Sequence, residues 1–158
     1  DPLLRPEEIV LVMDRNSIRG ALPGGSLSSA TFLGSFGVTD PAVETVSLFR
    51  SDDIHLFLDI ENSLIKFDVT RDGSTVTWEG EITPELLARV LSGAMLDITV
   101  VFNAGVVSFS IDGAVIAGIA NTEDIFQNLM LTRPLELGNG VTAGPLTLIS
   151  RALTAERI

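Results

Sequence analysis

The stretch from Asp97 to Gly118, DITVVFNAGVVSFSIDGAVIAG, constrains the fold more than any other part of the chain. Asp112-Gly113 is typical of a two-residue hairpin turn, in which both residues need positive φ, and Ala104-Gly105 fits a second such turn. With these turns, the apolar side chains of all three strands, Phe109 among them, fall on one face of a sheet. Because the two turns agree, the stretch predicts a β-meander that lies on another layer.

A second apolar register runs through residues 46–79 and predicts four more strands. The inward-facing pairs in this register are Val46 with Leu58, Leu48 with Leu56, Leu58 with Phe67, and Phe67 with Trp78. On the opposite face Asp59 meets Lys66, which predicts a cross-strand ion pair. The only tryptophan of the chain, Trp78, is therefore predicted to lie in the core.

Start and stop signals predict one helix from Pro84 to about Ser92, with Thr83 as its N-cap and Gly93 just beyond its end. The other expected elements are a strand at 9–13, mostly loop at 20–41 with one short strand at 31–36, a helical turn at 122–129, and closing strands at 135–137 and 146–149. Many short strands and one helix predict an all-β fold, an antiparallel two-sheet jelly-roll sandwich with a short inserted helix.

Length and composition restrict the partners. The 158 residues suit one domain, residues 1–158, which we expect to be part of a larger chain or assembly. A net charge of −11 repels phosphate backbones and anionic lipid, so no nucleic-acid partner is expected. No apolar run approaches the ~20 residues of a membrane-spanning helix, so membrane insertion is not expected either. The absence of cysteine excludes disulfides, thiolate catalysis and cysteine-ligated metals.

Several segments together resemble a known family. HLFLDIENSLIKFDV with the Asp-Gly turn after it, ITVVFNAGVVSFSIDGAVIAG, LELGNG and the terminal ALTAERI are similar to the laminin-G-like branch of the concanavalin A-like lectin and glucanase superfamily. The resemblance covers residues 45–158 and implies a jelly-roll sandwich. It also implies a binding or adhesion module that recognises glycans, with an extracellular, cell-surface or virion-surface location.

Two other functions stay open, a structural decoration or fibre domain of a phage or virus-like particle and a degenerate polysaccharide-active enzyme. Glucanases of this superfamily carry an E-x-D-x-x-E strand, which this chain lacks. The sole histidine, His55, has no Gly-x-Ser-x-Gly or second-histidine context, and no other nucleophile has an evident base. We therefore expect that the chain is not an enzyme.

The candidate ligand-binding residues lie on the outward face of the sheet predicted at 46–79, and they are Phe49, His55, Phe57, Asp59 and Lys66. Aromatic rings stack on sugars and charged groups bond sugar hydroxyls, so this face predicts glycan binding. Alternatively, a loop or a neighbouring protein subunit covers Phe49 and Phe57, and His55 is an ordinary surface or packing histidine. The expected partners are thus a glycan or neighbouring subunits.

Three carboxylates, those of Asp52, Asp53 and Asp72, fall on loops at one end of the same predicted sheet. Clustered carboxylates with nearby loop carbonyls suit calcium, and laminin-G-like domains often bind calcium at a rim. Ordinary turn chemistry, at Asp72-Gly73 especially, explains the same residues without a metal. A calcium site is therefore one of two open interpretations.

Overall fold

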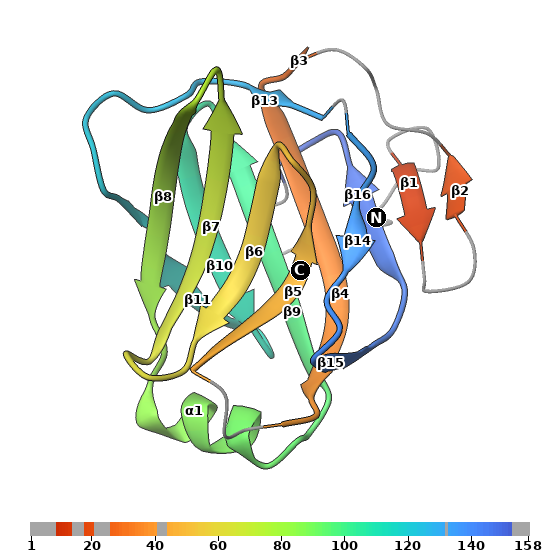
Figure 1. Ribbon diagram of the computed structural model, residues 1–158, viewed down its shortest axis with the longest axis vertical. Helices are drawn as coiled ribbons and strands as arrows, with labels where there is room; N and C mark the ends of the chain where they lie inside the picture. Colours follow the sequence, from red (N-terminus) through yellow and green to blue (C-terminus); the bar gives the residue numbers. More distant parts are fainter. Residues whose placement is uncertain (1–8, 14–17, 21–25, 41–43, 132, 153–158) are drawn as a thin grey trace.

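The computed structural model describes residues 9–13, 18–20, 26–40, 44–131 and 133–152. Two antiparallel sheets lie face to face, and helix α1 (Pro84–Leu91) lies across one end of them (Figure 1). Over these residues the fold is an antiparallel β-sandwich of the jelly-roll type with one helix, as predicted. No helix in these ranges is long and apolar enough to cross a membrane.

The larger sheet has the strand order β11-β10-β9-β4-β16-β1-β2, and β15 also pairs with β4. Its strands are β1 (Ile9–Met13), β2 (Ile18–Gly20), β4 (Ser29–Val38), β9 (Leu96–Asn103), β10 (Val106–Ile111), β11 (Ala114–Ala117), β15 (Val141–Ala143) and β16 (Leu146–Ile149). The predicted meander forms β9, β10 and β11, and Phe109 pairs with Val100 and Ile116 as expected. Both hairpin turns were therefore assigned correctly.

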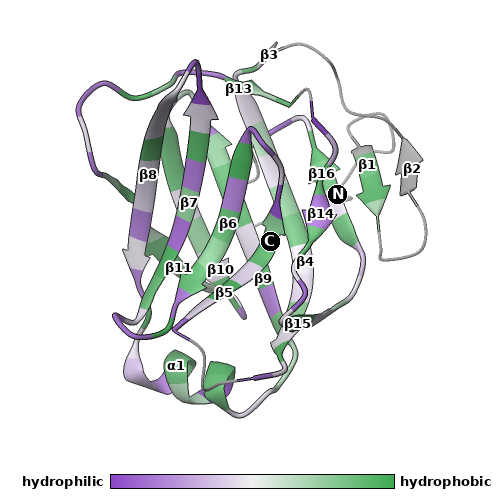
Figure 2. Ribbon diagram, viewed as in Figure 1, coloured by the Kyte–Doolittle hydropathy of each residue, from purple (hydrophilic) through white to green (hydrophobic). Residues whose placement is uncertain are grey.

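The second sheet has the order β12-β8-β7-β6-β5-β14. Its strands are β5 (Thr45–Arg50), β6 (Ile54–Asp59), β7 (Leu64–Arg71), β8 (Ser74–Glu81), β12 (Ile119–Ala120) and β14 (Glu136–Leu137). A small third sheet pairs β3 (Ser26–Leu27) with β13 (Leu129–Met130). Figure 2 shows polar and apolar residues alternating along β6, β7 and β8, so one face of this sheet is polar.

Aromatic side chains connect the two sheets through the core. Phe32 of β4 stacks on Phe49 of β5 with ring centroids 5.1 Å apart and lies 6.0 Å from Phe67 of β7. Trp78 of β8 lies 6.4 Å from Phe67 and 5.9 Å from Phe102 of β9. The chain of rings therefore crosses between the sheets at Phe32 and again at Phe102, and Trp78 is a core residue as predicted.

Strand β5 differs from its prediction because it contains a β-bulge between Ser47 and Phe49. The extra residue makes Phe49, rather than Leu48, pair with Leu56, and both Leu48 and Phe49 are buried. Arg50 consequently takes the outward position at the end of the strand. The prediction that Phe49 lies on the outward face is wrong, because a bulge reverses the side-chain alternation beyond it.

The register between β6 and β7 differs from the predicted one by two residues. Leu58 pairs with Ile65, because the loop occupies residues 60–63 and Asp59 is the last residue of β6. The Asp59 carboxylate accepts a hydrogen bond from the backbone N–H of Asn62 at 3.2 Å and so defines where the turn begins. A shift of two residues leaves each side chain on its predicted face.

The segment expected to be mostly loop at 20–41 contains the ten-residue central strand β4, which lies between β9 and β16. The expected short strand at 31–36 is thus only the middle of a long one. Glycine within this strand has a packing role, since a Cβ at Gly34 would lie 2.7 Å from the ring of Phe36. The loop-like composition of β4 makes room for core rings.

The helical turn expected at 122–129 is wrong. The segment runs as bends until β13 begins at Leu129. The Arg71 guanidinium, at the end of β7, donates to the carbonyl of Asn128 at 2.5 Å and lies 4.8 Å from the ring centre of Phe126. Contacts with a neighbouring strand end therefore hold this segment in place of local helical bonds.

Helix α1 has the predicted caps. The Thr83 hydroxyl accepts from the backbone N–H of Leu86 at 3.3 Å, and Gly93, beyond the last turn, has φ +80°. An ion pair of 2.8 Å between Arg89 and Asp112 connects the helix to the turn between β10 and β11. The helix thus lies against the meander.

Replacing Phe49 by alanine should lower the free energy of unfolding by about 3–5 kcal/mol, because the buried ring stacks on Phe32. The matched substitution Phe57→Ala should cost clearly less, because that ring is partly exposed. Urea unfolding of both variants measures the difference. Equal losses would show that the two rings do not differ in burial.

Ala104 has φ +48° in the hairpin turn, a conformation that costs a non-glycine residue about 1–2 kcal/mol. The substitution Ala104→Asn creates the Asn-Gly pair that such turns prefer, so it should raise the free energy of unfolding by about 0.5–1 kcal/mol. The control Ala114→Asn, at an exposed strand position, should not stabilise the protein. Thermal melting compares the two, and a lower melting temperature for Ala104→Asn would contradict the assigned turn.

Candidate functional site

The outward face of the six-stranded sheet carries polar and aromatic side chains in rows that cross the strands. One row comprises Arg50, His55, Asp68 and Thr77, and the next comprises Ser47, Phe57, Lys66 and Glu79. Asp59 and Leu64 continue the face at the next position. Four of the five predicted ligand residues, all except Phe49, therefore lie together on this face.

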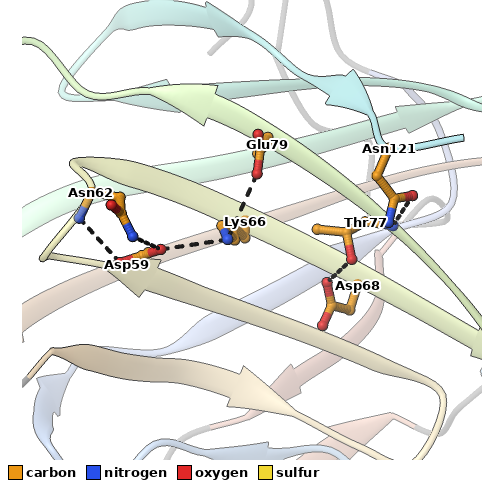
Figure 3. Close-up of polar contacts among 7 residues, drawn as sticks. All are labelled: Asp59, Asn62, Lys66, Asp68, Thr77, Glu79 and Asn121. Carbon is orange, nitrogen blue, oxygen red and sulfur yellow. Dashed lines mark hydrogen bonds and ion pairs between the residues drawn. The ribbon is translucent and has the colours of Figure 1, made fainter.

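Lys66 lies between two carboxylates, 3.4 Å from Asp59 and 3.6 Å from Glu79 (Figure 3). The predicted Asp59–Lys66 ion pair is confirmed. Asp59 also accepts from the side-chain amide of Asn62 at 3.0 Å. Hydrogen bonds from Asn62, aided by Lys66, lower the pKa of Asp59 despite the opposing effect of burial. This part of the face is therefore charged, internally paired and held in one arrangement.

A second polar group lies nearer to β8. The Thr77 hydroxyl donates to the carboxylate of Asp68 at 2.7 Å, and the Thr77 backbone N–H donates to the side chain of Asn121 at 3.2 Å (Figure 3). Farther along, the hydroxyls of Thr70 and Thr75 lie 2.9 Å apart. These contacts satisfy the polar groups within the sheet.

His55 combines an aromatic and a polar contact. Its ring stacks on Phe57 with centroids 4.6 Å apart, and its Nε2 lies 3.0 Å from the hydroxyl of Ser47. Burial lowers the pKa of His55, outweighing the opposing charge of Asp68, and Arg50 lowers it further. The imidazole is therefore neutral at pH 7.

A hollow of about 480 Å³ opens beside His55, at the edge where β14 pairs with β5. The residues that line it are Arg50, Ser51, Asp52, His55, Arg133, Pro134 and Glu136. A second hollow of about 280 Å³ lies along the same edge and shares Arg50 and Glu136 with the first. Together they extend the outward face into a recess with charged walls.

Short polar contacts position the wall that contains Arg133. Its backbone N–H donates to the Asp53 carboxylate at 3.0 Å. The turn that carries Asp53 is itself held by the Ser51 hydroxyl, which accepts from the N–H groups of Asp53 and Ile54 at 3.1 and 3.2 Å. The loop between β5 and β6 and the segment before β14 are thus joined.

Three charged residues of the hollow, Arg50, Arg133 and Glu136, were not identified from the sequence. Arg50 faces outward because of the bulge, Glu136 comes to the site through the pairing of β14 with β5, and Arg133 through its backbone hydrogen bond to Asp53. One local signal was available, since the adjacent apolar pair Leu48-Phe49 breaks the alternation of a half-buried strand. By contrast, β14 has only two residues, so its sequence does not indicate that it pairs with β5.

The three carboxylates of the calcium hypothesis have separate surroundings. Asp52 lines the hollow, Asp53 accepts from the backbone of Arg133, and Asp72 occupies a tight turn with φ +52°. In the described part of the chain, no group of three or more His, Cys, Asp or Glu side chains is placed to hold a metal ion. Calcium binding by these residues stays a prediction that the geometry does not favour.

The contact between Ser47 and His55 resembles a nucleophile and its base, which the sequence did not suggest. The nearest carboxylate in the same row, Asp68, accepts from Thr77. The surrounding backbone belongs to paired strands, which do not present converging N–H donors to an oxyanion. This geometry suits a binding contact better than acyl transfer.

No family model and no curated protein matches the sequence, whereas solved structures match the fold. The receptor binding domain of botulinum neurotoxin C/D mosaic serotype matches with a TM-score of 0.61 at 10% identity, over 95% of this chain and 49% of that one. A second match is a structure whose description says that cell entry of botulinum neurotoxin type C depends on interaction with two ganglioside molecules. Its TM-score is 0.53 at 11% identity, over 84% of this chain and 34% of that one. The Caenorhabditis elegans galectin LEC-6 matches with a TM-score of 0.55 at 12% identity, over 92% of this chain and 98% of that one.

The chain thus spans half or less of the neurotoxin chains but almost the whole galectin. At these identities the matches show a shared β-sandwich fold. Membership of the laminin-G-like branch stays a prediction.

The loss of stability of the folded protein at acidic pH should depend in part on Asp59. Its pKa is lowered from the ordinary 3.8, so the folded state holds this proton less tightly than the unfolded state does. The stabilisation from the carboxylate is therefore present above about pH 4 and is lost as the pH falls through the lowered pKa.

The substitution Asp59→Asn should accordingly destabilise the protein near neutral pH, and its deficit relative to wild type should shrink as the pH falls below about 4. Urea unfolding of both proteins at a series of pH values measures this deficit. A deficit that does not change with pH would show that the carboxylate charge contributes nothing.

Proposed function

We propose that the domain is a non-catalytic glycan-binding module that uses the outward face of the six-stranded sheet. The observation that carries this proposal is the stacked pair of His55 and Phe57 beside a hollow of about 480 Å³. Partly exposed rings present an apolar surface to a sugar ring, and the charged walls of the hollow bond its hydroxyls. The glycan would lie from the hollow across Phe57 toward Lys66.

Each residue has a distinct role in this arrangement. Phe57 and His55 form the floor, and Asp59 and Lys66 bond hydroxyls at one edge without rearrangement, because they are already paired. At the other edge, the carboxylates in the wall of the hollow accept from hydroxyls.

The fold comparisons support the class of domain. One match is a galectin, and another is described through ganglioside interaction. Because this chain spans only 34% of that neurotoxin chain, the support concerns the kind of domain and not the position of the site. A glycan-binding role also agrees with the expected extracellular, cell-surface or virion-surface location.

A second candidate function, contact with a neighbouring protein subunit, is favoured by Ile119. This side chain is 71% exposed on β12, opposite Glu79 in the same row as Phe57. A partner in a particle or fibre would bury Ile119 and Phe57 together and exclude water from both.

Screening of the protein against a glycan array, followed by calorimetry, tests the glycan proposal. His55→Ala and Phe57→Ala should each weaken binding of the best glycan about threefold to tenfold, because each removes a stacking ring. The control Val115→Ala, at a residue 57% exposed on the other sheet, should bind normally.

Loss of binding in the Val115→Ala control as well would count against a site on this face. If the wild type binds no glycan, and if concentration-dependent self-association is abolished by Ile119→Ser, the protein-contact function replaces the glycan one.

A further inference from the structure

The hollow beside His55 contains two arginines, Arg50 and Arg133, that form no ion pair with any described residue. Other cations in the described part of the chain have partners, since Lys66 and Arg89 form ion pairs and the Arg71 guanidinium donates to a carbonyl. The side chains of Arg50 and Arg133 form neither an ion pair nor a hydrogen bond with any described residue. This is unexpected in a chain with 21 acidic and only 10 basic residues.

The positions of Arg50 and Glu136 on neighbouring strands would allow an ion pair between them. Glu136 of β14 is the direct partner of Arg50 on β5. Their side chains nevertheless form no ion pair within the described structure, and both line the hollow. Arg50 is therefore available to a ligand.

The charges of the hollow also indicate what kind of ligand it suits. Guanidinium groups bond carboxylates through two parallel N–H donors, which is stronger and more specific than bonding a neutral hydroxyl. The hollow also presents the carboxylates of Asp52 and Glu136, which repel a free inorganic anion but accept hydrogen bonds from hydroxyls. A ligand that satisfies both kinds of group carries an acidic group and hydroxyls together.

We propose that this hollow binds an acidic sugar residue, with Arg50 and Arg133 on its carboxylate and Asp52 and Glu136 on its hydroxyls. The inference rests on the proposed glycan-binding function and specifies the class of sugar. The neutral ring of His55 extends the floor from the hollow to Phe57, so the acidic residue is one end of a longer glycan. The hollow thus presents two positive and two negative side chains, which match the acidic group and the hydroxyls of such a sugar respectively.

Two pairs of probes isolate the carboxylate. Methyl glucuronide and methyl glucoside differ only at C6, and the methyl glycoside of N-acetylneuraminic acid is compared with its neutral methyl ester. Calorimetry should show that the wild-type chain prefers the acidic member of at least one pair about tenfold, the value of one charge-assisted hydrogen bond. Arg50→Gln and Arg133→Gln should each remove most of this preference.

Control variants separate the site from general charge. Arg89→Gln changes the net charge equally, on helix α1, and should keep the preference. Arg50→Lys and Arg133→Lys keep the charge but lose the planar fork, so they should keep part of it. If the melting temperature of a glutamine variant shows that it is not folded like the wild type, the corresponding lysine variant is used in its place.

The outcomes distinguish this inference from the proposed function. Binding of neutral glycans alone, unaffected by the arginine variants, would overturn the acidic-sugar site and leave the glycan module intact. Sodium sulfate that binds as tightly as the acidic sugars would show a general anion site and would also overturn it. Binding of no glycan at all would defeat both proposals.

Discussion

The contact between Phe32 and Phe49 holds the two sheets together at the strand on which the candidate site depends. The stack continues through Phe67 and Trp78 to Phe102, so large rings from both sheets fill the middle of the sandwich. Burial of such rings supplies a large part of the free energy that keeps a sandwich closed. The two sheets therefore stay packed chiefly through these rings, and the charged groups of the polar face outside add to that stability.

Local chemistry explains why much of the fold was predictable from sequence. Asp112-Gly113 specifies its backbone conformation almost alone, and the strands on either side inherit their register from it. Thr83 and Gly93 likewise delimit helix α1. Even an error of two residues between β6 and β7 did not misplace a side chain, because faces repeat every second residue.

The missed features depend on packing between distant segments. The strand β4 has a loop-like composition, and only the ring of Phe36 packed on Gly34 shows why glycine belongs there. The bulge in β5 changes one position, yet it exchanges the expected outward ring of Phe49 for Arg50. Arg133 enters through a hydrogen bond to Asp53, far away in sequence. Half of the candidate site, namely His55, Phe57, Asp59 and Lys66, was therefore predictable, and the charged hollow was not.

The bulge also couples recognition to the core. Phe49 and Arg50 are consecutive residues, so the stacking of Phe49 on Phe32 also fixes the backbone from which the Arg50 side chain extends. A side chain that starts from a rigid backbone loses less conformational entropy when it meets a ligand, and this lowers the cost of binding. Core substitutions that merely loosen the stack on Phe32 would then weaken affinity through greater motion at the rim, well before the domain unfolds.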